Sequence, residues 1–238
     1  MHLASDSHAI GSCESCALKS GEFFCHLEKA ALKAFDAISF ATTYPGGASL
    51  FAEEEAPKGV FVLCKGRVKL TMTSSEGKTV ILRIVRPGAV LGLHAVVSGK
   101  PYQAAAEAME PCQLNFVRRD DFLRFLGEHS EASIHAAQQL SESYQAACNT
   151  VRSLGLGHSA SGKLARFLLD SSTAGRQTAQ GTRVRFTMTH EEIGQVIGTS
   201  RETVTRTLGE FKNKHLVAVN GSVLLIQNNA ALESFVEA

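Results

Sequence analysis

The chain has 238 residues, of which 44% are hydrophobic, enough for two modest domains with cores of their own. Its 24 basic and 23 acidic side chains give a net charge of +1, which excludes a protein that holds polyanions by bulk charge. The N-terminus lacks the basic start and apolar run of a signal peptide, and no apolar run approaches the ~18 residues of a membrane helix. We therefore expect a cytoplasmic protein without membrane contact.

Three of the six cysteines lie close together near the N-terminus, within SCESCALKSGEFFC. Cys13 and Cys16 form a C-x2-C pair, and eight residues separate Cys16 from Cys25. A flexible bend at residues 19–21 lets the three thiols reach one ion or cluster. In a reducing cytosol, such a group indicates metal or redox chemistry rather than a disulfide framework. A fourth ligand would complete an iron–sulfur or zinc site, and the spacing leaves these candidates open: Cys64, Cys112, Cys148 and, for zinc, His26.

Residues 39–117 alternate between apolar and polar side chains, and Lys-Gly, Glu-Gly and Pro-Gly pairs mark turns between the alternating runs. The alternating apolar set is Val60, Val62, Val68, Leu70, Met72, Val80, Leu82 and Ile84. Many short strands at this spacing predict an antiparallel β-roll, or jelly roll, which we place at residues 29–120. Cys112 alternates with Leu114 and Phe116, as a buried strand cysteine would.

The pattern then changes to that of a long helix, which we place at residues 121–157. Its apolar residues recur at alternating spacings of three and four: Ala137, Leu140, Tyr144, Ala147, Val151 and Leu154. This spacing is the seam of a two-stranded coiled coil, and it predicts a homodimer in which the helix pairs with its own copy. The alternative is that the stripe packs on the roll of its own chain.

Gly155 and Gly157 mark a break before a last domain, residues 158–238. The first part of this domain predicts a short helix at residues 161–169. Residues 171–182, SSTAGRQTAQGT, read as a polar loop.

The rest of this domain has the element order of a winged helix-turn-helix. Thr189-His-Glu-Glu192 is a capping box that begins a helix through Ile197. After a Gly-Thr turn, Ser200 caps a second helix that runs to about Lys214. Asn220-Gly221 lies between two apolar runs and predicts a hairpin with a type I′ turn, which would form the wing. The whole chain is therefore expected to be α+β: an antiparallel β-roll, a long dimerisation helix and a winged helix-turn-helix.

The second helix of this motif has side chains that suit a DNA major groove. Val204, Leu208 and Phe211 fall on one face and attach the helix to its domain. The other side carries Arg201, Glu202, Thr205 and Arg206. Arginine can donate two hydrogen bonds to guanine, glutamate can accept from cytosine, and a threonine methyl can meet a thymine methyl.

Local charge supports contact with the phosphates of double-stranded DNA. Between Ser159 and Val217 there are nine basic and five acidic residues, an excess that the global charge hides. The predicted DNA-binding set is Thr189, Ser200, Arg201, Glu202, Thr205, Arg206 and Lys212. The alternative is a solvated charged helix with Arg–Glu pairs three or four residues apart.

The stretch TMTHEEIGQVIGTSRETVTRTLGEF resembles the helix-turn-helix signature of the cyclic-AMP receptor protein/fumarate–nitrate regulator superfamily of bacterial transcription factors. The order of roll, long helix and winged helix matches this superfamily as well, so the resemblance covers essentially the whole chain. It implies a homodimer that binds an inverted-repeat site beside a promoter, acts with RNA polymerase as an activator or a repressor, and responds to a signal sensed in the N-terminal domain.

The resemblance also indicates which signal is absent. Cyclic-nucleotide binders of the superfamily carry a Gly-Glu pair for the ribose and an Arg-Ser pair for the phosphate. In the matching stretch, VLGLHAVVSGKPYQAAA, Leu93 stands at the Glu position and Gln103-Ala104 at the Arg-Ser position. Without the guanidinium and the carboxylate, we expect no cyclic nucleotide to bind in the roll.

Oxygen-sensing members of the fumarate–nitrate branch ligate a [4Fe–4S] cluster with three N-terminal cysteines and a fourth in the strand before the dimerisation region. The resemblance therefore implies that Cys13, Cys16, Cys25 and Cys112 hold such a cluster. The branch's best-known pattern has a shorter loop between its second and third cysteines than the eight residues found here. Zinc at the N-terminus, or haem or another small molecule in the roll, remains the alternative.

An enzyme with a DNA-binding tail is the alternative from a different class. The sequence has no nucleophile–base motif, Walker loop, dinucleotide fingerprint or H-E-x-x-H motif. We therefore expect a regulator that is not an enzyme.

Overall fold

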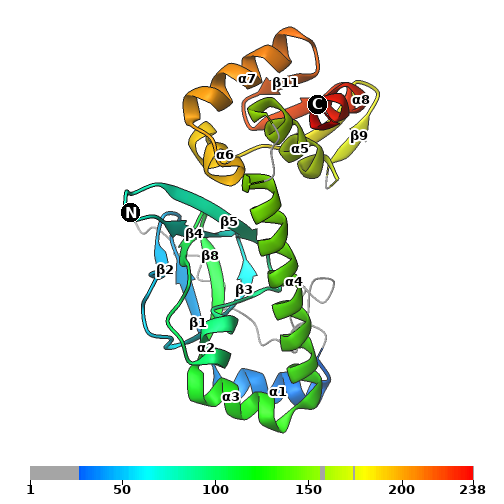
Figure 1. The fold of residues 1–238 in the computed structure, drawn as a ribbon. Coiled ribbons are helices and arrows are strands. Elements are labelled where there is room, and N and C mark those ends of the chain that lie inside the picture. Colours follow the sequence, from blue (N-terminus) through cyan, green and yellow to red (C-terminus); the bar gives the residue numbers. More distant parts are fainter. Residues whose placement is uncertain (1–26, 156–158, 174, 238) are drawn as a thin grey trace, which may run out of the picture. The chain divides into compact units, whose positions relative to one another are not determined.

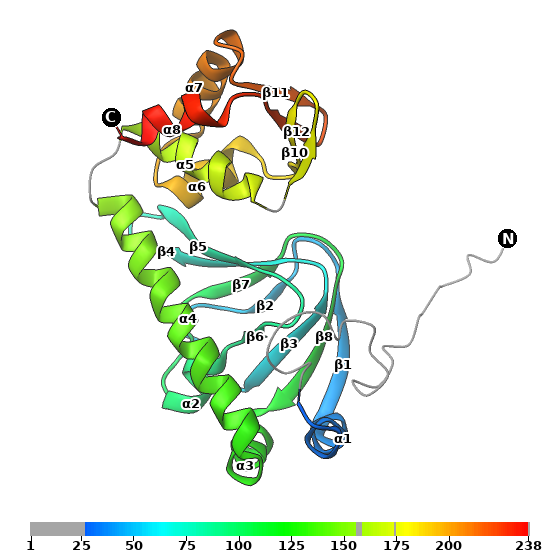
Figure 2. The same ribbon diagram turned by 90° about the vertical axis from the view of Figure 1, so that its right-hand side faces the viewer.

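Two antiparallel sheets form the N-terminal roll in the computed structural model, which describes residues 27–155, 159–173 and 175–237 (Figure 1). One sheet has the strand order β1-β8-β3-β6 and the other β2-β7-β4-β5 (Figure 2). The strands are β1 (Ser39–Tyr44), β2 (Ser49–Phe51), β3 (Gly59–Lys65), β4 (Val68–Thr73), β5 (Thr79–Val85), β6 (Val90–Leu91), β7 (Ala105–Ala108) and β8 (Cys112–Arg118). The predicted β-roll is therefore confirmed.

Contacts divide the chain into two compact units, of which the second comprises Lys78–Ile81 and Ala147–Ala238. The first unit has two apolar clusters, one inside the roll and one between a sheet and the helices beside it. Strand β3 separates the two clusters, because Phe61 and Leu63 face the inside of the roll while Val60 and Val62 face the helices. Both faces of β3 are buried, so its sequence is continuously apolar rather than alternating.

Helices flank the roll, and only some of them were predicted from the sequence. Helix α1 (Lys29–Ile38) was not predicted, although Ala31, Leu32 and Phe35 form an apolar stripe that packs against the sheet. Helix α2 (Leu93–Ser98) follows β6. The single helix expected at residues 121–157 is instead two helices, α3 (Arg119–Glu128) and α4 (Ser130–Gly155), separated at His129.

Helix α4 is held to the roll by a buried amide. Gln139 is 4% exposed, and its Oε1 accepts from the backbone N–H of Val90 at 2.9 Å while its Nε2 donates to the Val90 carbonyl at 2.6 Å. Ala132 and Ala136 are buried on the same side of the helix. The side chain of Gln139 therefore continues the hydrogen bonding of β6 and sets which side of α4 faces the roll.

Strand β5 differs from its predicted alternation. Val80, Leu82 and Ile84 are only half-buried, whereas Ile81 and Val85 are buried. Both sets are apolar, so periodicity alone could not choose the inner face.

The second unit surrounds its own apolar cluster with helices and a four-stranded sheet of order β11-β12-β10-β9. Its elements are α5 (Ala160–Ser172), β9 (Arg176–Thr178), β10 (Gly181–Arg185), α6 (His190–Ile197), α7 (Arg201–Asn213), β11 (Val217–Asn220), β12 (Val223–Ile226) and α8 (Asn229–Glu237). The winged helix-turn-helix is confirmed. The stretch expected to be a polar loop at 171–182 instead contains the end of α5 and strand β9, which joins the wing sheet through β10.

The turn of the wing is also displaced from its predicted position. Asn220 pairs with Val223, so Gly221 and Ser222 are the two loop residues. Only Gly221, with φ of 58°, has a positive φ among these two. A glycine at the first central position is typical of a type II′ turn, so the type I′ prediction was wrong.

Candidate DNA-binding and sensor sites

Both helices of the helix-turn-helix begin with the predicted caps. The Thr189 side chain accepts from the backbone N–H of Glu192 at 3.1 Å, and the Glu192 carboxylate accepts from the Thr189 N–H at 2.9 Å. The Ser200 side chain accepts from the backbone N–H of Thr203 at 3.2 Å. The hydroxyls of Thr189 and Ser200, two of the predicted DNA contacts, therefore serve as helix caps in the structure.

The turn between α6 and α7 depends on glycine at two positions. Gly198 ends α6 with φ of 70°, a conformation that other residues adopt at a cost. A Cβ on Gly194 would lie 2.7 Å from the carbonyl oxygen of Thr199, so only glycine lets the turn pack this closely on α6. This packing fixes the position of α7 on the domain.

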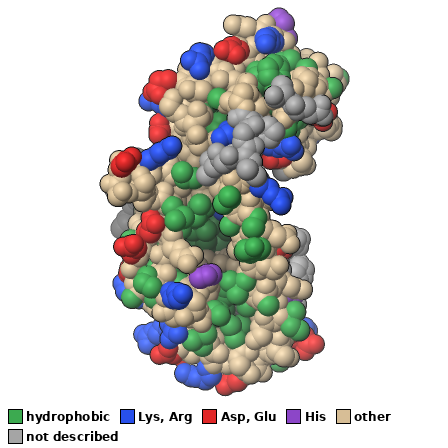
Figure 3. All heavy atoms as spheres, in the orientation of Figure 1, with side chains coloured by type: hydrophobic (Ala, Val, Ile, Leu, Met, Phe, Trp, Pro, Cys, Tyr) green, Lys and Arg blue, Asp and Glu red, His purple; other side chains and the backbone are tan. Residues whose placement is uncertain are grey.

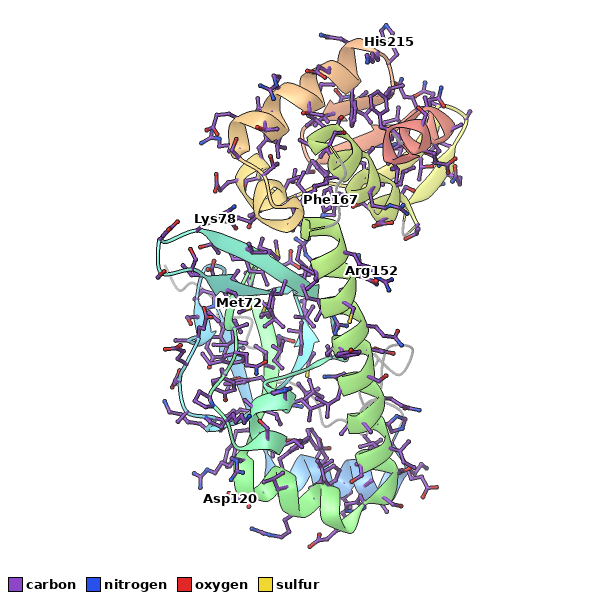
Figure 4. All side chains as sticks on the ribbon, viewed as in Figure 1. Met72, Lys78, Asp120, Arg152, Phe167 and His215 are labelled. Carbon is purple, nitrogen blue, oxygen red and sulfur yellow. The ribbon has the colours of Figure 1, made fainter. Side chains whose placement is uncertain are left out.

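Helix α7 has one buried face and one exposed face, as predicted. Val204, Leu208 and Phe211 are buried in the core of the domain. The predicted DNA contacts on α7 are all exposed: Arg201, Glu202, Thr205, Arg206 and Lys212. The helix ends before His215, which is labelled in Figure 4 and whose φ of 54° turns the chain into β11.

The carboxylate of Glu202 is stabilised in its charged form. Its own backbone N–H and the Ser200 hydroxyl donate to it, and both hydrogen bonds lower the pKa of this carboxyl below its ordinary value. Glu202 is therefore an ionised acceptor at neutral pH, at the end of α7 where recognition helices meet base edges.

Sequence reasoning missed one residue of this surface. His190, the first residue of α6, lies with its Nδ1 2.8 Å from the Thr205 hydroxyl oxygen on α7. The two residues are fifteen positions apart, so neither helical periodicity nor a capping motif connects them.

Helix α4 has an exposed apolar face distinct from the one that packs on the roll. Tyr144 is 72% exposed and Val151 68% exposed, and Ala137 and Ala147 are exposed with them. Leu140 is half-buried and packs in the cluster of its own chain, so it belongs only in part to the predicted seam. The side chain of Leu154, the last member, lies outside the described residues. In Figure 3, apolar side chains gather on this face of the first unit, over the roll and along α4.

Of the predicted cluster ligands, the structure describes only Cys112. Cys13, Cys16 and Cys25 lie outside the described residues, within which no group of three or more His, Cys, Asp or Glu could hold a metal ion. Cys64 and Cys148 are half-buried cysteines.

Cys112 is a buried thiol at the start of β8. It is 2% exposed and belongs to the apolar cluster inside the roll with Leu114. Its Sγ lies 3.1 Å from the Glu110 carbonyl oxygen and 3.4 Å from that of Arg67. Burial raises the pKa of this thiol, although the two backbone hydrogen bonds oppose the effect. A Cβ on Gly66 would lie 2.6 Å from Sγ, so the thiol sits directly beneath the β3–β4 turn.

The inside of the roll near α2 is filled by aromatic rings. The rings of Phe51 and Tyr102 stack with centroids 4.0 Å apart, and Phe61 lies 5.9 Å from Phe51. The Tyr102 hydroxyl donates to the Gly59 carbonyl at 2.8 Å, and a Cβ on Gly92 would lie 2.8 Å from the Tyr102 ring. Burial raises the pKa of Tyr102, which keeps the hydroxyl a neutral donor.

Two uncharged residues stand where nucleotide-binding relatives carry charged ones. Leu93 is buried at the start of α2, and Gln103 is exposed in the following segment. Neither side chain offers a charge to a sugar phosphate. Among the residues that the structure describes, no helix is long and apolar enough to cross a membrane.

Comparison with known families defines the class of protein. Residues 41–129 match the cyclic nucleotide-binding domain family, and residues 162–235 match the Crp-like helix-turn-helix domain family. This pair of domains, in this order, defines a DNA-binding transcription regulator.

Curated relatives match most of the chain. The chain is 25% identical over 190 residues to the CRP-like cAMP-activated global transcriptional regulator of Mycobacterium tuberculosis, covering 79% of this chain and 84% of that protein. It is 25% identical over 184 residues to the cAMP-activated global transcriptional regulator CRP of Pasteurella multocida, covering 77% and 88%.

Solved structures share the fold. FixK2 from Bradyrhizobium japonicum has a TM-score of 0.73 at 22% identity, covering 83% of this chain and 97% of that one. A CooA mutant from Carboxydothermus hydrogenoformans has a TM-score of 0.76 at 22% identity, covering 91% and 96%. The two domain matches and the curated relatives show that the chain belongs to the CRP/FNR family of regulators.

Proposed function

We propose that the protein acts as a homodimer in which two copies of α7 read the half-sites of an inverted-repeat operator, and that it senses oxygen or redox state through a [4Fe–4S] cluster. The observation that carries the DNA-reading part is the exposed group Arg201, Glu202 and Arg206 on a helix whose opposite face is buried in its domain. Dimerisation would set the two recognition helices about one DNA turn apart.

The exposed face of α4 supports the homodimer. Tyr144, Ala147 and Val151 follow coiled-coil spacing, while a different side of the helix, with Ala136 and Gln139, packs on the roll. Among the seam residues whose side chains the structure describes, the alternative, packing on the roll of the same chain, applies only to Leu140. A second copy of α4 is the occupant that this spacing fits.

The chemistry of the donor set supports the cluster, because thiolates are the usual ligands of iron–sulfur centres. In the proposal Cys13, Cys16, Cys25 and Cys112 supply four thiolates, and the bound cluster supplies the redox chemistry. The chain itself positions the four cysteines and provides the face on which two copies associate. In the proposal, the state of the cluster shifts the equilibrium between monomer and dimer.

Cys112 is the proposed ligand that lies within the described residues. It pairs with Tyr44, at the end of the β1–β8 ladder opposite to Ser39, where α1 joins the sheet. As a cluster ligand, Cys112 would leave its two carbonyl partners and ionise.

Purification under anaerobic conditions tests the cluster. We expect brown protein with about four irons and four sulfides per chain, and loss of the colour in Cys112→Ser. Cys64→Ser, at a half-buried cysteine outside the proposed set, is the matched control and should keep the colour. Colourless wild-type protein with one tightly bound zinc would contradict the cluster, and a coloured Cys112→Ser variant would contradict the fourth ligand.

We also propose that the roll does not respond to cyclic nucleotides, although the relatives named above are cAMP-activated. The aromatic filling around Tyr102 and the apolar Leu93 support this. Addition of millimolar cyclic AMP should leave the operator affinity unchanged in a fluorescence-anisotropy titration. A tenfold tightening, about 1.4 kcal/mol, would show that the roll binds the nucleotide.

A further inference from the structure

A hydrogen bond joins the two helices of the DNA-binding motif on their exposed side. Nδ1 of His190, on α6, lies 2.8 Å from Oγ1 of Thr205, on α7. The same oxygen lies 2.9 Å from the carbonyl oxygen of Arg201, one turn earlier in α7. One hydroxyl is therefore held between a ring nitrogen and a backbone carbonyl.

The direction of both bonds follows from the number of protons. A carbonyl oxygen can only accept, so Thr205 donates its single hydroxyl proton to Arg201. The ring nitrogen of His190 must then be the donor, which means that Nδ1 carries a proton. The hydroxyl of Thr205 consequently has no proton left to donate to a DNA base.

This arrangement changes what Thr205 can offer to DNA. The residue is exposed and lies between Glu202 and Arg206 in the sequence of the reading helix. A freely rotating threonine hydroxyl can bond to several base edges, whereas a methyl group matches the C5 methyl of thymine. Because the hydroxyl is hydrogen-bonded to His190 and to the Arg201 carbonyl, the methyl group is the part of Thr205 best suited to contact a base.

We infer that His190 is a positioning residue for base reading, which holds the Thr205 hydroxyl against α7 so that the methyl group reads a thymine methyl in each half-site. The inference rests on the proposed DNA-reading role of α7. It assigns a specificity role to a residue of α6 that does not itself need to touch the base.

The test uses the operator selected by the full-length protein from random DNA, with deoxyuridine replacing thymine one position at a time. Uracil lacks only the C5 methyl. For the wild type we expect one thymine in each half-site to be sensitive to this replacement. Replacing it by deoxyuridine should weaken binding about fourfold, which corresponds to ~0.8 kcal/mol for one methyl group. Thr205→Ser keeps the hydroxyl and removes the methyl, so it should bind the thymine and uracil sites equally.

Variants of His190 separate positioning from a general structural role. Asparagine places an N–H donor at the position of Nδ1, whereas the glutamine amide is one bond further out. His190→Asn should therefore keep the thymine preference, and His190→Ala and His190→Gln should lose it. A purely structural role would weaken binding to thymine and uracil sites by the same factor.

The outcomes distinguish this inference from the function on which it rests. Failure of the wild type to select any inverted repeat would contradict the proposed DNA reading. Selection of an inverted repeat whose thymines can all be replaced by uracil without loss would overturn the inference alone. Full thymine preference in His190→Ala would show that Thr205 is oriented without the histidine.

Discussion

At the scale of single residues, the side chains at the start of α7 have two different roles. Some stabilise the helix, and others are available to contact DNA. Ser200 is used as a cap, whereas Arg201 and Arg206 are exposed. Glu202 and Arg206 are four positions apart and so lie on the same side of the helix. Both can face one G·C pair, the carboxylate toward the cytosine amine and the guanidinium toward guanine.

Replacement of Arg206 tests this reading. Arg206→Ala should cost about 1–3 kcal/mol per half-site and relax the preference for a G·C pair at one position of each half-site. The half-sites should be centred roughly 10 base pairs apart. Selection from random DNA measures both properties, and a variant that kept full discrimination at that pair would contradict the assignment.

Lys212 is the matched control at the other end of α7. It is exposed in the last turn of the helix and is expected to contact phosphate rather than a base. Lys212→Ala should therefore weaken binding to all sequences alike and reduce the dependence of affinity on salt.

At the scale of elements, the attachment of α4 to β6 depends on one amide. Gln139→Ala would leave the buried N–H and carbonyl of Val90 without partners, which should destabilise the protein by about 2–4 kcal/mol. Gln138, the neighbouring residue, is exposed, and Gln138→Ala should change stability little. Urea unfolding of the two variants measures the difference, and equal stabilities would show that the amide bonds contribute little.

At the scale of the whole molecule, the proposed dimer places Val151 against a second copy of α4. Val151→Arg would bury a charge in that seam and should shift the protein to monomers, with a parallel loss of operator affinity. Asn149 is two residues earlier and faces about 200° away around the helix, so Asn149→Arg should remain dimeric. Sedimentation measures the association state. Dimerisation that Val151→Arg leaves intact would exclude this seam.

Local features of the chain could be predicted from the amino-acid sequence. The capping box at Thr189 and the cap at Ser200 are set by residues three positions apart, and the buried face of α7 follows from helical spacing. The roll was recognisable because alternating apolar residues between glycine turns are typical of short strands. In each case the residues that form the element also carry its signal.

Features that join distant parts of the chain became visible only in the folded structure. It buried Val85 rather than Ile84 in β5, because both are apolar and only the neighbouring sheet selects a face. It placed the thiol of Cys112 inside the roll beneath Gly66. It also paired His190 with Thr205 and Gln139 with Val90. Such contacts depend on packing between elements, and no periodicity within one element encodes them.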